Sequence, residues 1–123
     1  MRLHILAMPL LLACCAEPPP VAERAGPPRE LVGRVAGKPQ NCVPLEQGQS
    51  LRIAGDGHVL LYGFGRTLWV NHLGQCSLNP DDVLVTRLYG SSYCRGYIVQ
   101  SVDRTSHIPG PTCILSDFVP YNR

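Results

Sequence analysis

The sequence holds 123 residues, enough for one small domain with a modest core, and its formal net charge is +2. A charge so close to zero excludes the strong basic excess that nucleic-acid-binding domains carry. Lys38 is the single lysine among eleven basic residues, which we attribute to genome composition rather than to function.

The first thirteen residues have the pattern of an export signal. Arg2 precedes an apolar run over residues 5–13, which is too short to cross a bilayer because a spanning helix needs roughly 20 apolar residues. The motif Leu11-Leu12-Ala13-Cys14 resembles a bacterial lipobox, in which a small residue precedes the cut and the cysteine thiol accepts diacylglycerol. We expect a lipoprotein signal over residues 1–13 and lipidation of Cys14. The alternatives are a plain secretory signal cut near Ala16 and no processing.

A proline-rich linker is expected over residues 14–29. Residues 17–28 hold five prolines and one strongly apolar residue, Val21. Such a segment cannot bury a core, and its prolines favour an extended spacer that reaches roughly 37 Å at about 3.1 Å per residue. We expect the linker to hold the folded part clear of a membrane surface; a tail without a function is the alternative.

Residues 30–123 predict an all-β domain with no helix longer than one turn. The turn-forming segments at residues 55–57 and 63–66 separate runs that are rich in β-branched and aromatic residues. The expected strands cover residues 51–53, 58–62, 67–72, 82–89, 96–102 and 112–119. Six short strands favour a small antiparallel meander that closes into a barrel or a compact sandwich.

Cysteine spacing predicts two disulfides within this domain. The domain cysteines are even in number and belong to a chain with an export signal: Cys42, Cys76, Cys94 and Cys113. No Cys-x-x-Cys motif is present, which argues against a zinc knuckle or a redox pair. Three pairings are open, and we favour Cys76–Cys94 together with Cys42–Cys113, which would join the two ends of the domain. Cys15 has no assigned partner; it is free, lipidated or bonded to another chain.

Four short segments follow one another along residues 41–121 in a characteristic order. They are Asn41-Cys42-Val43-Pro44-Leu45, Val70-Asn71-His72-Leu73 before Cys76, Tyr93-Cys94-Arg95-Gly96, and the closing segment at residues 113–121. In these features the chain resembles a proteobacterial family of small exported four-cysteine proteins that is classed as a domain of unknown function. The resemblance implies an exported, disulfide-bonded domain and no particular activity. Tyr97 stands near the place where members of that family carry an acidic residue, which puts any role of a carboxylate there in doubt.

Candidate metal-binding groups are few, and we favour a structural role for each. His58 and His72 bracket a hairpin, and imidazoles can bind zinc or copper, but two ligands do not complete a site. Asp81 and Asp82 lack the ligand spacing of a calcium loop. Residues 63–68 superficially resemble a phosphate-binding loop, yet the third glycine is missing and no helix is expected after them, so we interpret them as a hairpin turn.

Candidate catalytic groups are equally sparse. Ser91 and Ser92 precede Asp103 and His107, but no Gly-x-Ser-x-Gly elbow presents a nucleophile. We therefore expect no enzymatic activity, no cofactor and no bound metal. The aromatic residues exceed what so small a core requires: Tyr62, Phe64, Trp69, Tyr89, Tyr93, Tyr97, Phe118 and Tyr121. We expect most of them in the core, while rings that face solvent would form a binding surface.

The sequence thus predicts an envelope lipoprotein that acts as a binding or structural module. Residue +2 after the lipidated cysteine is Cys15 and not Asp, so the usual inner-membrane retention signal is missing. We expect a membrane anchor at Cys14 on the periplasmic face of the outer membrane, and a protein partner of unknown identity. The alternative is an inhibitor of a secreted hydrolase such as lysozyme, in which the exposed loop at residues 104–112 inserts into the active site at low entropic cost.

Overall fold

The computed structural model describes residues 28–123, and the expected signal, Cys14, Cys15 and nearly all of the linker lie outside the described residues. The described chain holds one short 3-10 turn and ten strands. These elements are η1 (Arg29–Leu31), β1 (Val35–Ala36), β2 (Cys42–Pro44), β3 (Arg52–Ala54), β4 (Val59–Tyr62), β5 (Thr67–His72), β6 (Val83–Thr86), β7 (Ser92–Cys94), β8 (Ile98–Val102), β9 (Pro109–Ile114) and β10 (Phe118–Asn122).

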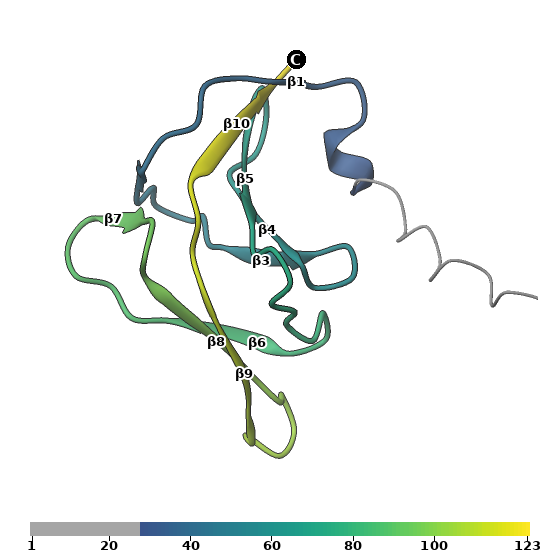
Figure 1. Ribbon diagram of the computed structural model, residues 1–123, viewed down its shortest axis with the longest axis vertical. Coiled ribbons are helices and arrows are strands. Elements are labelled where there is room, and N and C mark those ends of the chain that lie inside the picture. Colours follow the sequence, from purple (N-terminus) through teal and green to yellow (C-terminus); the bar gives the residue numbers. More distant parts are fainter. Residues whose placement is uncertain (1–27) are drawn as a thin grey trace, which may run out of the picture.

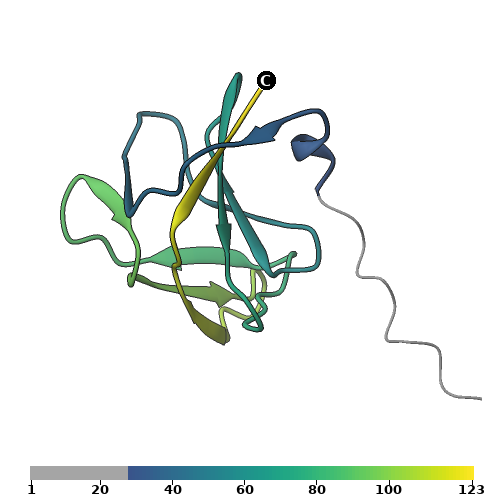
Figure 2. The same cartoon turned by 45° about the horizontal axis from the view of Figure 1, so that its top comes forward.

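The strands form three antiparallel sheets (Figures 1 and 2). The largest has the order β1-β10-β5-β4-β3, a three-stranded sheet has the order β6-β8-β9, and β2 pairs with β7 alone. Within the described residues each sheet keeps two open edges, and none closes into a barrel. The prediction of an all-β domain with antiparallel sheets is confirmed, and β3, β4 and β5 form a meander.

The chain crosses from one large sheet to the other between β9 and β10. The single strand expected over residues 112–119 is wrong, because β9 ends at Ile114 and β10 begins at Phe118. Asn71, fully buried in β5, holds the crossing: its side-chain nitrogen donates to Ser116 O at 2.7 Å, and its Oδ1 accepts from Ser116 N at 2.9 Å. A strand that changes sheets must interrupt its own hydrogen-bond ladder, and the interruption covers residues 115–117, where the polar pair Ser116-Asp117 separates the two apolar runs.

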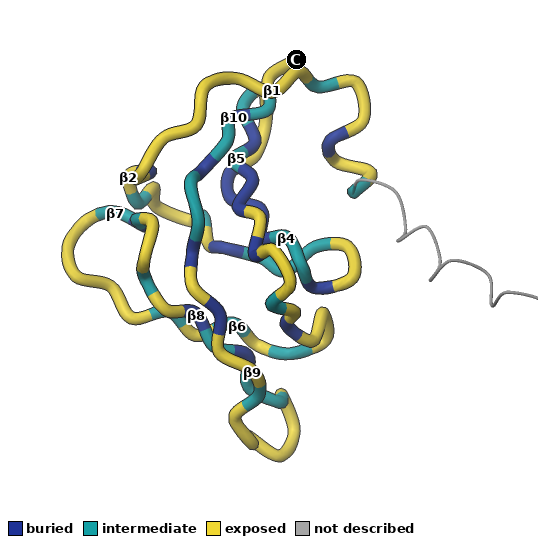
Figure 3. The backbone as a smooth tube through the Cα atoms, viewed as in Figure 1, coloured by how far each residue is buried: buried dark blue, intermediate teal, exposed yellow. Residues whose placement is uncertain are grey.

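The main core lies where the large sheets and β2 meet. Phe118 of β10, Leu60 of β4, Val99 of β8 and Val43 of β2 are all fully buried in it. Figure 3 draws all the buried stretches of the described chain in dark blue. Each large sheet therefore depends on the other to bury the apolar side chains of its core-facing side.

A second, smaller cluster lies on the opposite face of the five-stranded sheet. Successive residues of a strand point to opposite faces, so Leu61, Leu68 and Val70 point away from the main core. Leu31 of η1 is buried against them. The first described element therefore covers the second face of this sheet.

The two ends of the described chain are joined by backbone pairing. Val35 of β1 lies opposite Asn122 of β10, and the Arg34 guanidinium donates to Arg66 O at 2.9 Å. In Figure 1 this region is at the top of the molecule, while the loop between β8 and β9 projects at the bottom. The joined ends and that loop thus lie at opposite ends of the longest axis of the view.

Candidate functional site

The four domain cysteines form two disulfides, as predicted, but the favoured pairing is wrong. The bonds are Cys42–Cys94 and Cys76–Cys113. Pairing of β2 with β7 places Cys42 directly opposite Cys94, which fixes the first bond. A Cys42–Cys113 bond would join the two ends of the domain, and hydrogen bonds between β1 and β10 join them instead.

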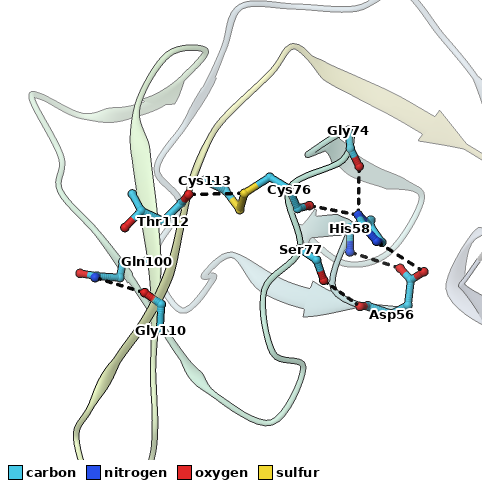
Figure 4. Close-up of a disulfide and its surroundings, with 9 residues drawn as sticks. All are labelled: Asp56, His58, Gly74, Cys76, Ser77, Gln100, Gly110, Thr112 and Cys113. Atoms are coloured by element: carbon cyan, nitrogen blue, oxygen red, sulfur yellow. Dashed lines mark hydrogen bonds and ion pairs between the residues drawn. A yellow bond between two sulfur atoms is a disulfide. The ribbon is translucent and has the colours of Figure 1, made fainter.

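The Cys76–Cys113 disulfide connects the segment after β5 to β9 (Figure 4). Cys113 is buried in the main core, so this bond joins the two large sheets from inside. His58 supports it: its Nδ1 lies 2.9 Å from Gly74 O and 3.1 Å from Cys76 O, on the turn that presents the cysteine. His58 therefore has a structural role in positioning the disulfide.

The remaining catalytic and metal candidates are not brought together as a site. No group of three His, Cys, Asp or Glu within residues 28–123 could hold a metal ion. His72 is exposed at the end of β5, while Ser92 lies in β7. Asp103 and His107 belong to the loop between β8 and β9, which lies apart from β7 in both ribbon views.

Most of the aromatic rings belong to the core, as expected. Tyr62, Tyr93 and Phe118 are buried, and the first two meet edge to face with their centroids 5.2 Å apart. Two rings stand out into solvent: Phe64 is 65% exposed and Tyr89 is 69% exposed. They mark two separate surfaces, one on each of the large sheets.

Tyr89 adjoins the apolar outer face of the sheet β6-β8-β9. Strand alternation turns Leu84, Val99 and Cys113 toward the core and turns their neighbours outward. The strand register places Ile98 opposite Ile114. We call the exposed apolar set the outer face: Val83, Val85, Ile98, Ile114 and Tyr89.

A hollow of about 210 Å³ lies at the outer face. Val85, Tyr89 and Ile98 provide its apolar walls, and Arg87 and Gln100 provide its polar groups. The Tyr89 ring packs edge to face on Tyr97, with centroids 5.4 Å apart, so its position is supported by a second ring. The hollow combines an apolar lining with a cationic group.

The loop at residues 103–108, here the β8–β9 loop, is shorter than expected because residues 109–112 belong to β9. Its turn is held by the Asp103 carboxylate, whose Oδ1 accepts from Ser106 N at 2.8 Å and from Thr105 N at 2.9 Å. These backbone hydrogen bonds, the one from Ser106 first, lower the pKa of Asp103. The Arg104 guanidinium donates to Asp81 O at 2.8 Å and fastens the loop to the segment before β6.

A second hollow, of about 320 Å³, lies at the turn end of the β4–β5 hairpin. We call it the aromatic pocket. The hairpin contributes Tyr62, Phe64 and Trp69, the end of β2 contributes Pro44, and the segment before β3 contributes Glu46 and Gln49. Residues 63–66 form the turn that the sequence predicts. The sequence did not predict the pocket. It is formed by the contact of residues 44–49 with the hairpin, and no local sequence pattern indicates that contact.

No protein-family model, curated protein or solved structure matches this chain. The likeness to the four-cysteine family of exported proteins therefore rests on its landmark residues and stays a prediction. None of the helices in the described part of the chain is long and apolar enough to cross a membrane.

Proposed function

We propose that this chain is a lipid-anchored binding module of the bacterial envelope and that it contacts a protein partner through the outer face. The observation that carries the proposal is the set of exposed apolar side chains on adjoining strands of the sheet β6-β8-β9. Single apolar residues are common on protein surfaces, whereas contiguous apolar patches mark interaction sites. We further interpret the two large sheets, which share one core, as the layers of a compact sandwich.

The chemistry of the hollow in the outer face suggests what the partner presents. Arg87 forms no salt bridge with any residue in the described range, although it lies among Val85, Tyr89 and Ile98. A charged group inside an apolar contact is costly unless it is paired. The partner segment therefore combines apolar side chains with a carboxylate that pairs with Arg87.

Membrane attachment at Cys14 is the second part of the proposal. The lipobox-like motif and the proline-rich linker support it, and two disulfides suit an oxidising compartment such as the periplasm. Intact mass of the protein purified from membranes tests it: we expect a chain that begins at Cys14 and carries a diacylglyceryl or triacyl adduct. An unmodified chain beginning at Glu17 would contradict the anchor.

Site-directed photocrosslinking in the native envelope tests the outer face. A photoreactive residue replaces Ile98 in the full chain, and the matched control replaces Val35, which is 74% exposed on the other large sheet. We expect one protein adduct from position 98 and none from position 35. The purified partner should then bind the purified chain about tenfold more weakly after Val85→Glu and unchanged after Val35→Glu. Equal adducts from both positions, or adducts only between copies of the chain, would contradict the proposal.

Inhibition of a secreted hydrolase is a second candidate, favoured by the pre-ordered β8–β9 loop. A loop already held in one conformation loses little entropy when it enters an active site. Ile108, exposed near the end of the loop, would be the inserted side chain. Adding the purified chain should slow lysozyme, and Ile108→Asp should remove the effect. Full lysozyme activity at micromolar concentrations of the chain would exclude this target.

A further inference from the structure

We propose that the aromatic pocket binds a small organic ammonium ion, such as a quaternary ammonium group. This inference is independent of the outer face, because the pocket lies on the hairpin β4–β5 and the segment before β3. Its volume of about 320 Å³ falls within the range of small-molecule sites, which begins near 300 Å³.

Three aromatic residues line the pocket, of which Tyr62 is only 2% exposed and presents little of its ring. Tyr62 and Trp69 are direct partners on neighbouring strands, so their side chains lie on the same face of the sheet. Phe64, from the turn, stands at the exposed side of the pocket. Faces of aromatic rings attract cations through their quadrupole, and tryptophan does so most strongly. Phe64 and Trp69 are therefore the two rings that a bound cation would contact.

The polar groups of the pocket mostly present acceptors. The Tyr62 hydroxyl donates to Pro44 O at 3.0 Å, and the Thr67 hydroxyl donates to Asn122 Oδ1 at 2.7 Å. Gln49 Nε2 donates to Glu46 Oε2 at 2.9 Å. Among the side chains that line the pocket, this leaves the Trp69 indole N–H and the second amide hydrogen of Gln49 as donors. A sugar needs both donors and acceptors from its site, whereas an ammonium ion needs rings and negative charge.

The charge of the pocket is negative. Glu46 is the one charged side chain among its lining residues, and within residues 28–123 it has no salt-bridge partner. Arg52 lies beside the pocket, where its guanidinium donates to Gly63 O at 3.1 Å, and it is paired with Glu30 at 2.6 Å. The Arg52 guanidinium also lies 4.5 Å from the centre of the Phe64 ring, which holds this ring in place beside the pocket. Glu46 is therefore the charge that a ligand meets, and an anion would be repelled.

Trp69 is the only tryptophan in the sequence, so its fluorescence reports on the pocket directly. The purified chain is titrated with tetramethylammonium and with choline. The matched control is dimethylbutanol, the choline analogue in which carbon replaces the ammonium nitrogen. We expect a saturable change in Trp69 emission with both cations. The uncharged analogue should bind at least about tenfold more weakly than choline. Equal binding of the uncharged analogue, or no saturable change with either cation, would overturn the proposal.

Two substitutions locate the binding. Glu46→Gln should weaken choline binding about tenfold, and Phe64→Ala should weaken it by a similar factor. Both side chains are exposed, so the thermal melting curves should remain close to that of the unchanged chain. The control Asp81→Asn removes an exposed carboxylate elsewhere and should leave binding unchanged. Unchanged affinity in Glu46→Gln, or a saturable response to N-acetylglucosamine in place of choline, would overturn the assignment of a cation site.

A quaternary ammonium group can reach the pocket as a free solute or as a lipid headgroup. Vesicles of phosphatidylcholine and of phosphatidylglycerol distinguish these sources. A Trp69 response to free choline alone supports a solute, and a response that also appears with phosphatidylcholine vesicles supports a headgroup. A response to phosphatidylglycerol vesicles alone would overturn the proposal, because that lipid carries no ammonium group.

Discussion

The two large sheets differ in how their second faces are covered. Each has one face in the common core and apolar side chains on the other. On the five-stranded sheet, Leu61 and Val70 are completely buried, because Leu31 of η1, itself only 8% exposed, packs over them. On the three-stranded sheet, Val85 and Ile98 are 50% and 54% exposed, and no described element covers them. The same chain thus covers one apolar face and leaves the other open.

The difference shows how little chain is needed to cover a face. A three-residue turn with one leucine is enough to complete the cluster on the five-stranded sheet. Exposed apolar area lowers solubility and gains nothing for folding, so a face left open is best explained by a partner that covers it. This contrast is the physical basis of the proposed outer face.

The largest expected effect comes from the core that both sheets share. Phe118→Ala should lower the free energy of unfolding by about 3–5 kcal/mol, because it leaves a cavity where the sheets meet. Ile114→Ala, four residues away on the outer face, should change it by less than about 0.5 kcal/mol. Urea unfolding of both variants measures the difference. A comparable loss in the two would mean that the outer face is part of the core.

Removal of one disulfide should have an effect of similar size to that of Phe118→Ala. The bonds span 37 and 52 residues, so the chain-entropy model gives each about 4 kcal/mol. Replacing Cys76 and Cys113 by alanine should nevertheless cost more than replacing Cys42 and Cys94, because Cys113 is buried between the sheets and Cys42 is exposed. Thermal melting of the two double variants measures this order. The reverse order would show that β2 and β7 hold the domain together more than the link between the large sheets does.

Local patterns predict strands well and their partners poorly. The hairpin of β4 and β5 was predictable, since turn residues 63–66 separate two runs of β-forming residues. The pairing of Cys42 with Cys94 was not, because β2 and β7 have three residues each and find one another only in the folded domain. The outer face could not be predicted for a different reason. Val83, Leu84 and Val85 are all apolar, so no alternation says which side faces the core.

Uncovering the five-stranded sheet should have a moderate effect. Leu31→Ala removes most of the side chain that covers Leu61 and Val70, and we expect a loss of about 2 kcal/mol in unfolding free energy. Ile98→Ala on the open face should stay within about 0.5 kcal/mol while weakening partner binding. Urea unfolding with the purified chain separates the two results. A loss of stability after Ile98→Ala equal to that after Leu31→Ala would remove the distinction between a covered and an open face.

The smallest expected effect concerns the β8–β9 loop, which adjoins the open sheet and is held by hydrogen bonds rather than by apolar packing.

The pKa of Asp103 lies below its usual value near 3.8, because the ionised carboxylate accepts the amide hydrogens of Ser106 and Thr105. A lowered pKa means that the folded loop favours the ionised form of Asp103. The stabilisation that this carboxylate gives the loop is therefore fully present above the usual pKa of an aspartate, and it is lost as the pH falls through the lowered pKa of Asp103. We expect hydrogen exchange at Thr105 and Ser106, corrected for the intrinsic rate, to accelerate below about pH 4, while exchange at Val99 in β8 does not. Asp103→Asn keeps an acceptor oxygen but cannot titrate. In this variant the corrected exchange rates at Thr105 and Ser106 should not rise below about pH 4. Acid-dependent exchange that persists in Asp103→Asn would assign the ordering of the loop to another group.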